Sequence, residues 1–97
     1  MKMPSYIFFK RLSNPLRIRI IDSLVKKPKT VTDLSKDLNV EQSKLSHALQ
    51  CLYCCSIVHR KKKGKNIIYS LNKETILPIF KLIQKHEKKF CKICRSK

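Results

Sequence analysis

The sequence predicts a mainly helical domain with a small β-hairpin in its second half. Two observations predict this class. Apolar residues recur at helical spacing over residues 4–55 and again over residues 73–90. Between these stretches, residues 57–71 change to a two-residue period on both sides of a basic segment, which is the pattern of a hairpin. A chain of 97 residues makes one small domain, so residues 1–97 are expected to fold as a single unit.

Two helices are expected in the N-terminal part, at residues 4–12 and 15–25. Asn14 is a good N-cap for the second helix, and Pro15 suits its first position because proline lacks a backbone donor. The first helix holds the run Tyr-Ile-Phe-Phe at residues 6–9, which is more apolar surface than one small core can bury. This surplus predicts an interface with another chain.

Residues 30–55 are expected to form two helices joined by a short turn. Thr30 and Asp33 have the spacing of a capping box, in which the hydroxyl and the carboxylate each accept a bond from a free backbone donor. The first helix is expected at residues 31–38 and the second at about residues 41–55. So short a break between two helices is typical of a helix-turn-helix.

The hairpin is expected over residues 57–71, with a basic tip at residues 61–66, and a last helix follows to about Phe90. Asn72 opens this last segment, but Pro78 predicts either a kink or a helix that starts near Pro78. The last helix also carries residues whose spacing alternates between four and three, as in a seam between paired helices: Ile79, Ile83, His86 and Phe90.

The charge balance is the strongest signal in the composition. Lys and Arg number 23 against 6 Asp and Glu, which gives a formal net charge of +17. Such a chain attracts polyanions, so nucleic acid or an anionic membrane surface is the expected partner. A membrane is the weaker candidate, because the cations cluster in the hairpin and not along one face of an amphipathic helix. No apolar run approaches about 18 residues and no signal peptide is recognisable, so a cytoplasmic location is expected.

A helix-turn-helix followed by a basic hairpin is the plan of a winged helix, so the predicted fold is a winged helix-turn-helix. The residues expected to contact DNA are Gln42, Ser43, Lys44, Ser46, His47, Gln50, Arg60, Lys61, Lys62, Lys63 and Lys65. The helix members carry small, amide or basic groups suited to base edges and phosphates, and the hairpin cations would make binding strongly salt-dependent. A solvated basic loop and a surface His47 without a role are the alternatives.

Four runs of residues stand in a recognisable order along the chain. Residues 12–21 read Leu-Ser-Asn-Pro-Leu-Arg-Ile-Arg-Ile-Ile, and residues 31–34 read Val-Thr-Asp-Leu. Residues 42–58 begin with Gln-Ser-Lys-Leu-Ser-His-Ala-Leu, and residues 60–71 combine an arginine, a Gly-Lys pair and Tyr-Ser-Leu. In this order they resemble the motifs of ArsR-type winged-helix repressors, and the resemblance covers about residues 9–86.

The resemblance implies a homodimer that binds a palindromic operator in double-stranded DNA and represses transcription until it senses an inducer. The dimerisation helices would lie in residues 4–25 and 73–90, which include the apolar run and the seam described above. The chain is therefore expected to be a DNA-binding transcriptional regulator. The alternative is a constitutive architectural DNA-binding protein without an inducer. An enzyme is not expected, because the sequence offers no acid–base constellation.

The residues that would sense an inducer depart from the family pattern. Family members that sense arsenic or cadmium often carry a cysteine pair in the first helix of the helix-turn-helix, but residues 31–36 hold no thiol here. The zinc-sensing branch places acidic and histidine ligands on the last helix. The matching positions in this chain are Lys73, Thr75, His86 and Lys89. Only His86 could coordinate a metal, so that zinc site is incomplete.

A second group of soft ligands lies near the C-terminal end, where His86, Cys91 and Cys94 form a His-x4-Cys-x2-Cys pattern. Two thiolates at this spacing can chelate zinc or another soft metal ion. The fourth ligand would be Cys54 or Cys55, a solvent molecule, or a residue of the partner chain. The helix must end before Cys91 for the three ligands to converge, since His86 and Cys91 point apart on an unbroken helix.

The cysteines allow other interpretations. Cations flank Cys91 and Cys94 and would favour a reactive thiolate, which predicts a redox role, while a third interpretation gives this pair no function. Cys51 and Cys55 lie on or beside the apolar stripe of their helix and are expected in the core, whereas Cys54 should point outward. The sequence leaves open the inducer, the operator, the regulated genes, and whether binding represses or activates.

Overall fold

The computed structural model of the chain describes residues 3–90, with side chains from residue 6 onward. Its elements, in chain order, are α1 (Met3–Leu12), α2 (Pro15–Lys26), β1 (Lys29–Thr30), α3 (Val31–Leu38), α4 (Gln42–Cys54), β2 (Val58–Lys63), β3 (Asn66–Leu71) and α5 (Ile76–Lys89). The strands form one antiparallel sheet in the order β1-β3-β2. The structure confirms a mainly helical fold with a small sheet.

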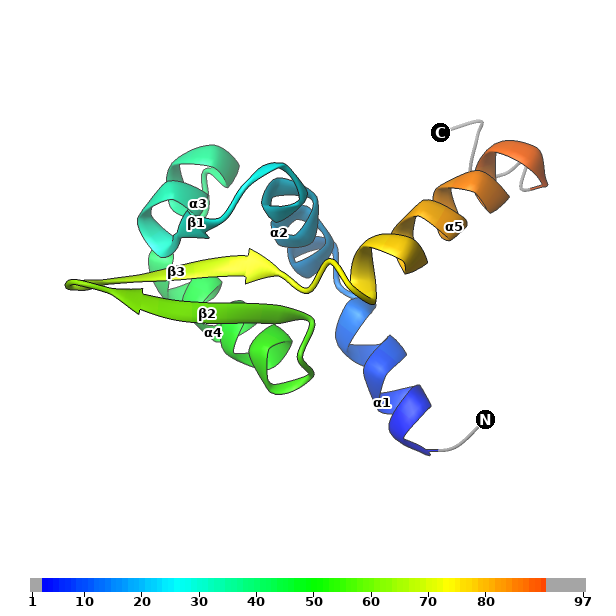
Figure 1. The fold of residues 1–97 in the computed structure, drawn as a ribbon, viewed down its shortest axis with the longest axis horizontal. Helices are drawn as coiled ribbons and strands as arrows, with labels where there is room; N and C mark the ends of the chain where they lie inside the picture. Colours follow the sequence, from blue (N-terminus) through cyan, green and yellow to red (C-terminus); the bar gives the residue numbers. More distant parts are fainter. Residues whose placement is uncertain (1–2, 91–97) are drawn as a thin grey trace.

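The molecule consists of a body with projections at its two ends (Figure 1). The helices α2, α3 and α4 pack with the sheet to form the body, and the β2–β3 hairpin, called the wing below, projects from one end. The helices α1 and α5 extend from the opposite end, so the molecule is elongated, with principal-axis extents of 46 × 31 × 22 Å.

The hydrophobic core lies in the body and draws on each of its helices. Leu24 of α2, Leu34 of α3 and Leu49 of α4 are buried, with no more than 1% of their surface exposed. Burying such a side chain contributes about 1.5–3 kcal/mol relative to leaving it in water. Leu12 at the end of α1 and Ile76 at the start of α5 are also buried, and they attach the two terminal helices to the body.

The predicted helix starts at α2 and α3 are confirmed by their capping bonds. The Asn14 side-chain oxygen accepts bonds from the backbone N–H groups of Leu16 and Arg17, at 2.9 and 3.2 Å. At α3, the Asp33 backbone N–H donates to the Thr30 hydroxyl at 3.1 Å, and the Thr30 backbone N–H donates to the Asp33 carboxylate at 3.2 Å. Each bond satisfies a donor that the helix itself leaves free.

The structure decides between the two alternatives for the last helix and corrects the expected boundary of the basic tip. The helix α5 begins at Ile76 and not at Asn72, which confirms the expected start near Pro78. Pro78 then lies in the first turn, where it is tolerated because the first backbone donors of a helix need no intrahelical partner. The wing closes in a two-residue turn, Gly64-Lys65, because Gly64 adopts a φ of 62° that suits a tight hairpin turn. Residues 61–63, expected in a basic tip, therefore belong to strand β2.

The strand β1 is absent from the sequence prediction. It is two residues long, and Lys29 and Thr30 pair with Tyr69 and Ile68 of β3, which makes β3 the central strand. So short a segment has no periodicity to detect, and it becomes a strand only because the hairpin lies beside it. Among the described residues, the helices are too short or too polar to cross a membrane.

Candidate nucleic-acid interface

The turn between α3 and α4 is held by bonds that involve its backbone. Asn39 adopts a left-handed conformation with a φ of 55°, and its N–H donates to the Ser35 carbonyl. The Ser35 hydroxyl donates to the Val40 carbonyl at 2.7 Å, and the Arg19 guanidinium of α2 donates to the Leu38 carbonyl at 2.7 Å. These bonds satisfy polar groups of the turn and tie the turn to α2, which fixes the direction in which α4 follows α3.

The helix α4 has one buried face and one exposed face. Its buried residues are Leu45, Ala48, Leu49 and Leu52. The exposed residues include every member of the helix set predicted to contact DNA: Gln42, Ser43, Lys44, Ser46, His47 and Gln50. The helix that would enter a DNA groove is therefore anchored by leucines on one side and presents amide, hydroxyl, imidazole and ammonium groups on the other.

The start of α4 lies beside the start of α2. A cleft of about 350 Å³ is lined there by Arg17 of α2 and by Ser43, Lys44 and His47 of α4. The Arg17 guanidinium donates to the Arg11 carbonyl at 3.1 Å, so it also bridges α1 and α2. Basic and hydroxyl side chains from two helices are thus gathered at the end of α4 that leads into the proposed contact face.

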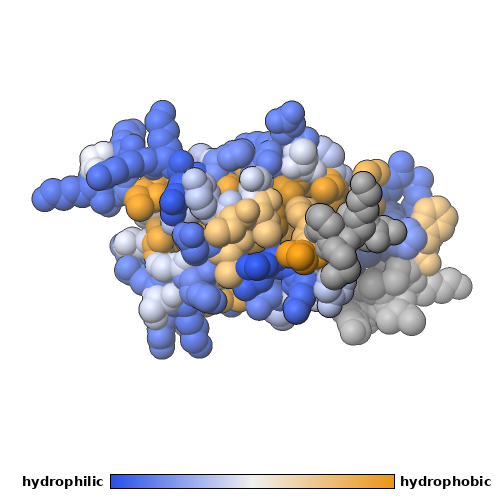
Figure 2. All heavy atoms as spheres, turned by 90° about the horizontal axis from the view of Figure 1, so that it is seen from below, coloured by the Kyte–Doolittle hydropathy of each residue, from blue (hydrophilic) through white to orange (hydrophobic). Residues whose placement is uncertain are grey.

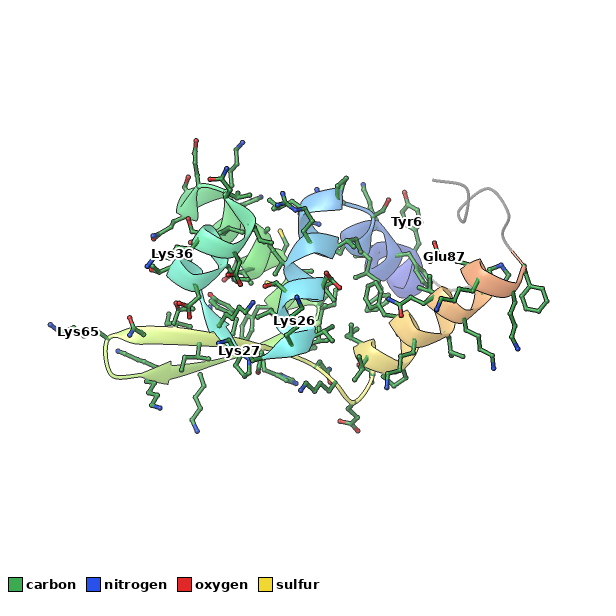
Figure 3. All side chains as sticks on the ribbon, turned by 90° about the horizontal axis from the view of Figure 1, so that it is seen from above. Tyr6, Lys26, Lys27, Lys36, Lys65 and Glu87 are labelled. Carbon is green, nitrogen blue, oxygen red and sulfur yellow. The ribbon has the colours of Figure 1, made fainter. Side chains whose placement is uncertain are left out.

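The cations of the wing alternate between its two faces. Residues 60–63 are all exposed on β2, and successive residues of a strand point to opposite sides. Arg60 and Lys62 therefore share one face, and Lys61 and Lys63 share the other. Figure 3 shows Lys65 at the free end of the wing, remote from the terminal helices. The basic character expected for this region is present, but it is distributed along a projecting strand.

Arg60 differs from the wing lysines because its side chain is engaged by α4. The guanidinium carbon lies 3.9 Å from the centroid of the Tyr53 ring. The same guanidinium donates to the Gln50 amide oxygen at 3.3 Å, and the Gln50 amide nitrogen donates to the Cys54 sulfur at 3.6 Å. Two residues predicted to contact DNA, Gln50 and Arg60, are therefore in contact with each other in the free chain.

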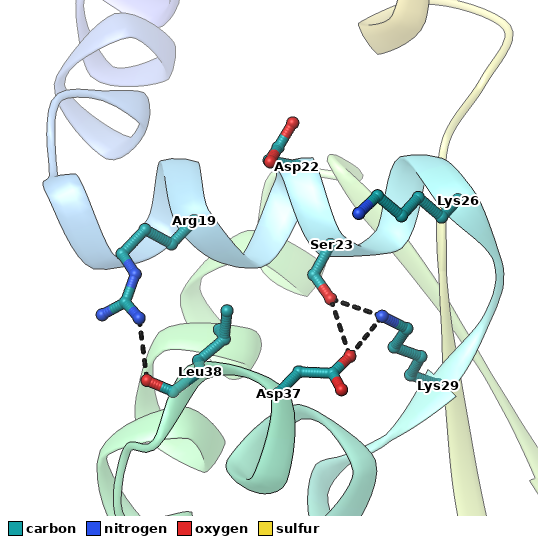
Figure 4. A pocket seen from close by; sticks show the side chains of 7 residues that line it. All are labelled: Arg19, Asp22, Ser23, Lys26, Lys29, Asp37 and Leu38. Carbon is teal, nitrogen blue, oxygen red and sulfur yellow. Dashed lines mark hydrogen bonds and ion pairs between the residues drawn. The ribbon is translucent and has the colours of Figure 1, made fainter.

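A buried lysine that the sequence analysis missed stabilises the body (Figure 4). Lys29 is only 7% exposed, and its ammonium donates to the Ser23 hydroxyl at 2.7 Å and forms an ion pair with Asp37. The hydrogen bond from Lys29 lowers the pKa of the Asp37 carboxyl below its usual value. This network joins α2, β1 and α3. In the sequence, Lys29 resembles the other lysines that follow α2, and no local signal marks it as buried.

The terminal helices expose apolar residues at the end of the molecule opposite the wing (Figure 1). Exposed fractions are 56% for Tyr6 and 49% for Phe9 of α1, and 66% for Leu82 and 43% for Ile83 of α5. Figure 2 shows hydrophobic surface over the middle of one face, while the wing end is hydrophilic. By contrast, the main apolar residues of α2 are buried in the core. The exposed apolar surface is thus concentrated on α1 and α5, and Leu82 adds to the predicted seam.

The predicted metal ligands lie on separate elements or outside the described residues. Cys54 is exposed near the end of α4, as expected, and His86 is exposed on α5 with its ring 5.4 Å from that of Phe90, between centroids. Cys91 and Cys94 lie outside the described residues. Within residues 3–90, no group of three or more His, Cys, Asp or Glu residues could hold a metal ion.

The other two cysteines of α4 and its end are only half-buried. Cys55 packs against the core, whereas Cys51 is partly exposed and belongs to no buried cluster among the described residues. The expectation that both fill the core is therefore met in part. Neither residue lies in the exposed contact face formed by the start of α4.

Residues 14–60 match the model of the bacterial regulatory protein, arsR family. Over 79 residues the chain is 29% identical to a transcriptional repressor SmtB homolog of Synechocystis, covering 81% of this chain and 60% of that protein. It is 35% identical over 79 residues to the uncharacterized HTH-type transcriptional regulator Rv0081 of Mycobacterium tuberculosis, covering 80% and 69%. It is 36% identical over 69 residues to an arsenical resistance operon repressor of Bacillus subtilis, covering 70% and 66%.

Solved structures show the same fold. The crystal structure of Rv0081 superposes with a TM-score of 0.75 at 34% identity, covering 80% of this chain and 79% of that one. A homodimeric winged helix-turn-helix DNA-binding domain from Mycobacterium bovis superposes with a TM-score of 0.81 at 22% identity, covering 88% and 79%. Both the sequence match and the shared winged helix-turn-helix lead to one conclusion: the chain belongs to the arsR family of bacterial regulatory proteins, which are DNA-binding transcriptional regulators.

Proposed function

We propose that the protein is a homodimeric transcriptional repressor that acts in the cytoplasm by binding a palindromic operator. The observation that carries this proposal is the exposed face of α4. Its six polar residues face solvent, while four apolar residues anchor the helix in the core. An anchored helix whose outer face carries amide, hydroxyl, imidazole and ammonium groups is suited to hydrogen bonding with base edges in the major groove.

The wing supplies the part of the affinity that does not depend on base sequence. Lys61, Lys62, Lys63 and Lys65 are exposed on a hairpin that projects beyond the body. Each phosphate that such a cation neutralises releases counterions, so affinity falls steeply as the salt concentration rises. The wing and α4 together provide the two kinds of contact that a sequence-specific DNA-binding protein uses.

The dimer is proposed to form through α1 and α5. Leu82 and Phe90 are 66% and 72% exposed, an unfavourable state for large apolar side chains in a single chain. A cleft of about 350 Å³ also lies between α2 and α5, and it is lined in part by Ile18 and Phe80. A two-fold dimer presents two copies of α4, so its operator would contain two inverted half-sites about one helical turn apart, centre to centre.

DNA selection followed by footprinting tests this function. The expected result is that the protein enriches an inverted repeat from a random library and protects that repeat as a single footprint. Fluorescence anisotropy should show stronger binding to the selected duplex than to a scrambled duplex of equal length. Equal binding to both duplexes would instead favour the architectural alternative, in which the protein coats DNA without sequence preference.

We further propose that a soft metal ion or a redox change at the C-terminal end regulates DNA binding. The sequence pattern His86, Cys91 and Cys94 supports a zinc-type site, and His86 is accessible on α5. Bound zinc would supply a tetrahedral centre that draws these ligands together. Cys54 is a weaker candidate ligand, because Gln50 donates to its sulfur and it lies on α4 rather than α5.

Metal analysis and thiol titration separate the two forms of regulation. A metal site predicts bound zinc, loss of two free thiols on loading, and loss of both effects in a Cys91→Ser/Cys94→Ser variant. A redox site predicts no bound metal but a disulfide after mild oxidation in the wild-type protein. If the metal-free, metal-loaded and oxidised forms of the protein all bind the operator with the same affinity, this region has no part in the regulation.

A further inference from the structure

We propose that Arg60 is a positioning residue that holds the wing against α4 through Tyr53 and Gln50, and that it does not contact a DNA phosphate. These three residues are called the wing latch below. The inference rests on the proposed DNA-binding function and deepens it. It distinguishes the wing residue that orients the wing relative to α4 from the wing residues that neutralise DNA phosphates.

The wing latch joins two elements that are distant in sequence. Tyr53 and Gln50 lie three residues apart on α4 and therefore on one face of the helix. Arg60, on β2, stacks on the Tyr53 ring at 3.9 Å from the guanidinium carbon to the centroid. It also donates to the Gln50 amide oxygen at 3.3 Å. One side chain thus makes a cation–π contact and a hydrogen bond to the same helix.

The position of Arg60 along β2 explains why this contact matters. Val58 is fully buried, and the strand is exposed from His59 onward. Arg60 pairs with Tyr69, which is only 6% exposed, whereas Lys62 pairs with Ile67, which is 42% exposed. Arg60 is therefore the last wing residue on its face that lies opposite a core residue. A restraint at this point sets the direction of the projecting part of the wing.

The residue type also fits a positioning role. Among the five cations from residue 60 to residue 65, Arg60 is the arginine and the other four are lysines. A planar guanidinium can stack on an aromatic ring while its N–H groups donate within the guanidinium plane, whereas an ammonium is a compact point charge that cannot do both. Lysine suffices for phosphate neutralisation, but only arginine satisfies Tyr53 and Gln50 together.

The wing latch also changes the role of Gln50. Its amide oxygen accepts from Arg60, and its amide nitrogen donates toward the Cys54 sulfur at 3.6 Å. Each polar atom of this side chain therefore has one partner within the protein, and these bonds fix the orientation of the amide. Base readout by α4 is then left to the residues nearer its N-terminal end, Gln42 to His47, and the latch sets the distance between those residues and the wing lysines.

The experiment compares variants that keep or remove charge, using the duplex selected by the wild-type protein and a scrambled duplex as probes. Arg60→Lys and Tyr53→Leu should each weaken binding to the selected duplex about tenfold, since each removes the stacking contact and disturbs the bond to Gln50. Tyr53→Phe, which keeps the ring, should bind like the wild type. The double variant of Tyr53→Leu and Arg60→Lys should be no weaker than either single variant, because both break the same contact.

The salt dependence distinguishes positioning from phosphate contact. Arg60→Gln should weaken binding while the slope of log Kd against log salt stays unchanged. The matched control is Lys62→Gln on the same face of β2, which should lower that slope by about 0.9, the value for one phosphate contact. An equal drop in slope for both variants, or wild-type affinity in Arg60→Lys, would overturn the proposal.

A readout without DNA keeps this test separate from that of the proposed function. The side-chain amide resonances of Gln50 should shift in Arg60→Lys and in Tyr53→Leu but not in Lys62→Gln. Thermal unfolding should be nearly unchanged in all variants, because the latch residues are exposed. If the wild-type protein shows no sequence preference, the proposed function fails, while unshifted Gln50 resonances would reject the latch alone.

Discussion

The helix-turn-helix body and the terminal helices treat their apolar residues in opposite ways. In the body, Leu34 and Leu49 are fully buried within one chain. By contrast, Leu82 of α5 and Phe90 at the C-cap of α5 remain 66% and 72% exposed. The difference shows that a single chain completes the core of the body, and it supports the proposed dimer, in which a second copy would bury the apolar side of α1 and α5. Stability and assembly should therefore respond to different substitutions.

The largest expected effect is the loss of a core leucine. Leu49→Ala should lower the free energy of unfolding by about 2–5 kcal/mol, because it removes a buried side chain and leaves a cavity between α4 and the rest of the body. Urea denaturation followed by circular dichroism measures this change. Loss of stability of less than about 1 kcal/mol would mean that the body is less well packed than its burial indicates.

Substitutions on α5 should affect assembly more than folding. Replacing both Leu82 and Ile83 by Ser should weaken the dimer roughly 100-fold or more, since each loses about 1.5–3 kcal/mol of burial that only the partner chain provides. Analytical ultracentrifugation over a concentration series measures the dissociation constant. Lys88→Ser is the matched control, because helical spacing places Lys88 on the opposite side of α5. Wild-type dimerisation of the double variant would move the interface elsewhere.

The ion pair between the buried Lys29 and the partly exposed Asp37 predicts a dependence of stability on pH. The pKa of Asp37 is lower in the folded chain than in the unfolded chain, mainly because Lys29 donates to its carboxylate. The stabilisation is therefore complete above the unfolded pKa of Asp37 and is lost as the pH falls through the folded pKa. Thermal melts from neutral to acidic pH should show a smaller acid-induced fall in Tm for Asp37→Asn than for the wild type. The variant should already be less stable at neutral pH, because Lys29 loses its counter-ion.

The smallest effect is expected at a helix cap. Asn14→Ala should cost about 1 kcal/mol, because it leaves the Leu16 and Arg17 backbone donors without the side-chain acceptor they have in the native chain. Asn14→Asp should retain most of the stability, since a carboxylate accepts the same bonds. Denaturation midpoints of the two variants provide the measurement, and equal losses in both would argue against a capping role.

Local features of the site were predictable from the sequence because they depend on neighbours within a few residues. The Thr30 and Asp33 capping box, the turn after α3 and the polar face of α4 all follow from spacing along one helix. The six helix residues expected to contact DNA are exposed for the same reason. Their role in DNA binding stays a prediction, as does that of the wing lysines.

The rest of the site could not be predicted because it joins residues that are distant in sequence. Lys29 has the same local surroundings as its exposed neighbours, and only the packing of α2 against α3 places Ser23 and Asp37 around it. Likewise, Arg60 begins a run of cations, and nothing in the local sequence marks it as the member that contacts α4. The contact of β2 with α4 distinguishes it by placing Tyr53 and Gln50 beside it.

The sequence alone decided the order of the helices and the hairpin, the caps of α2 and α3, the polar face of α4 and the basic character of the wing, since periodicity, capping chemistry and charge are local properties. The tertiary structure decided which cation is buried, which one stacks on α4 and where the strand β1 forms. It also decided which apolar residues one chain leaves uncovered. The physical reason is that burial and side-chain pairing depend on which surfaces meet in space, and a one-dimensional pattern does not contain that information.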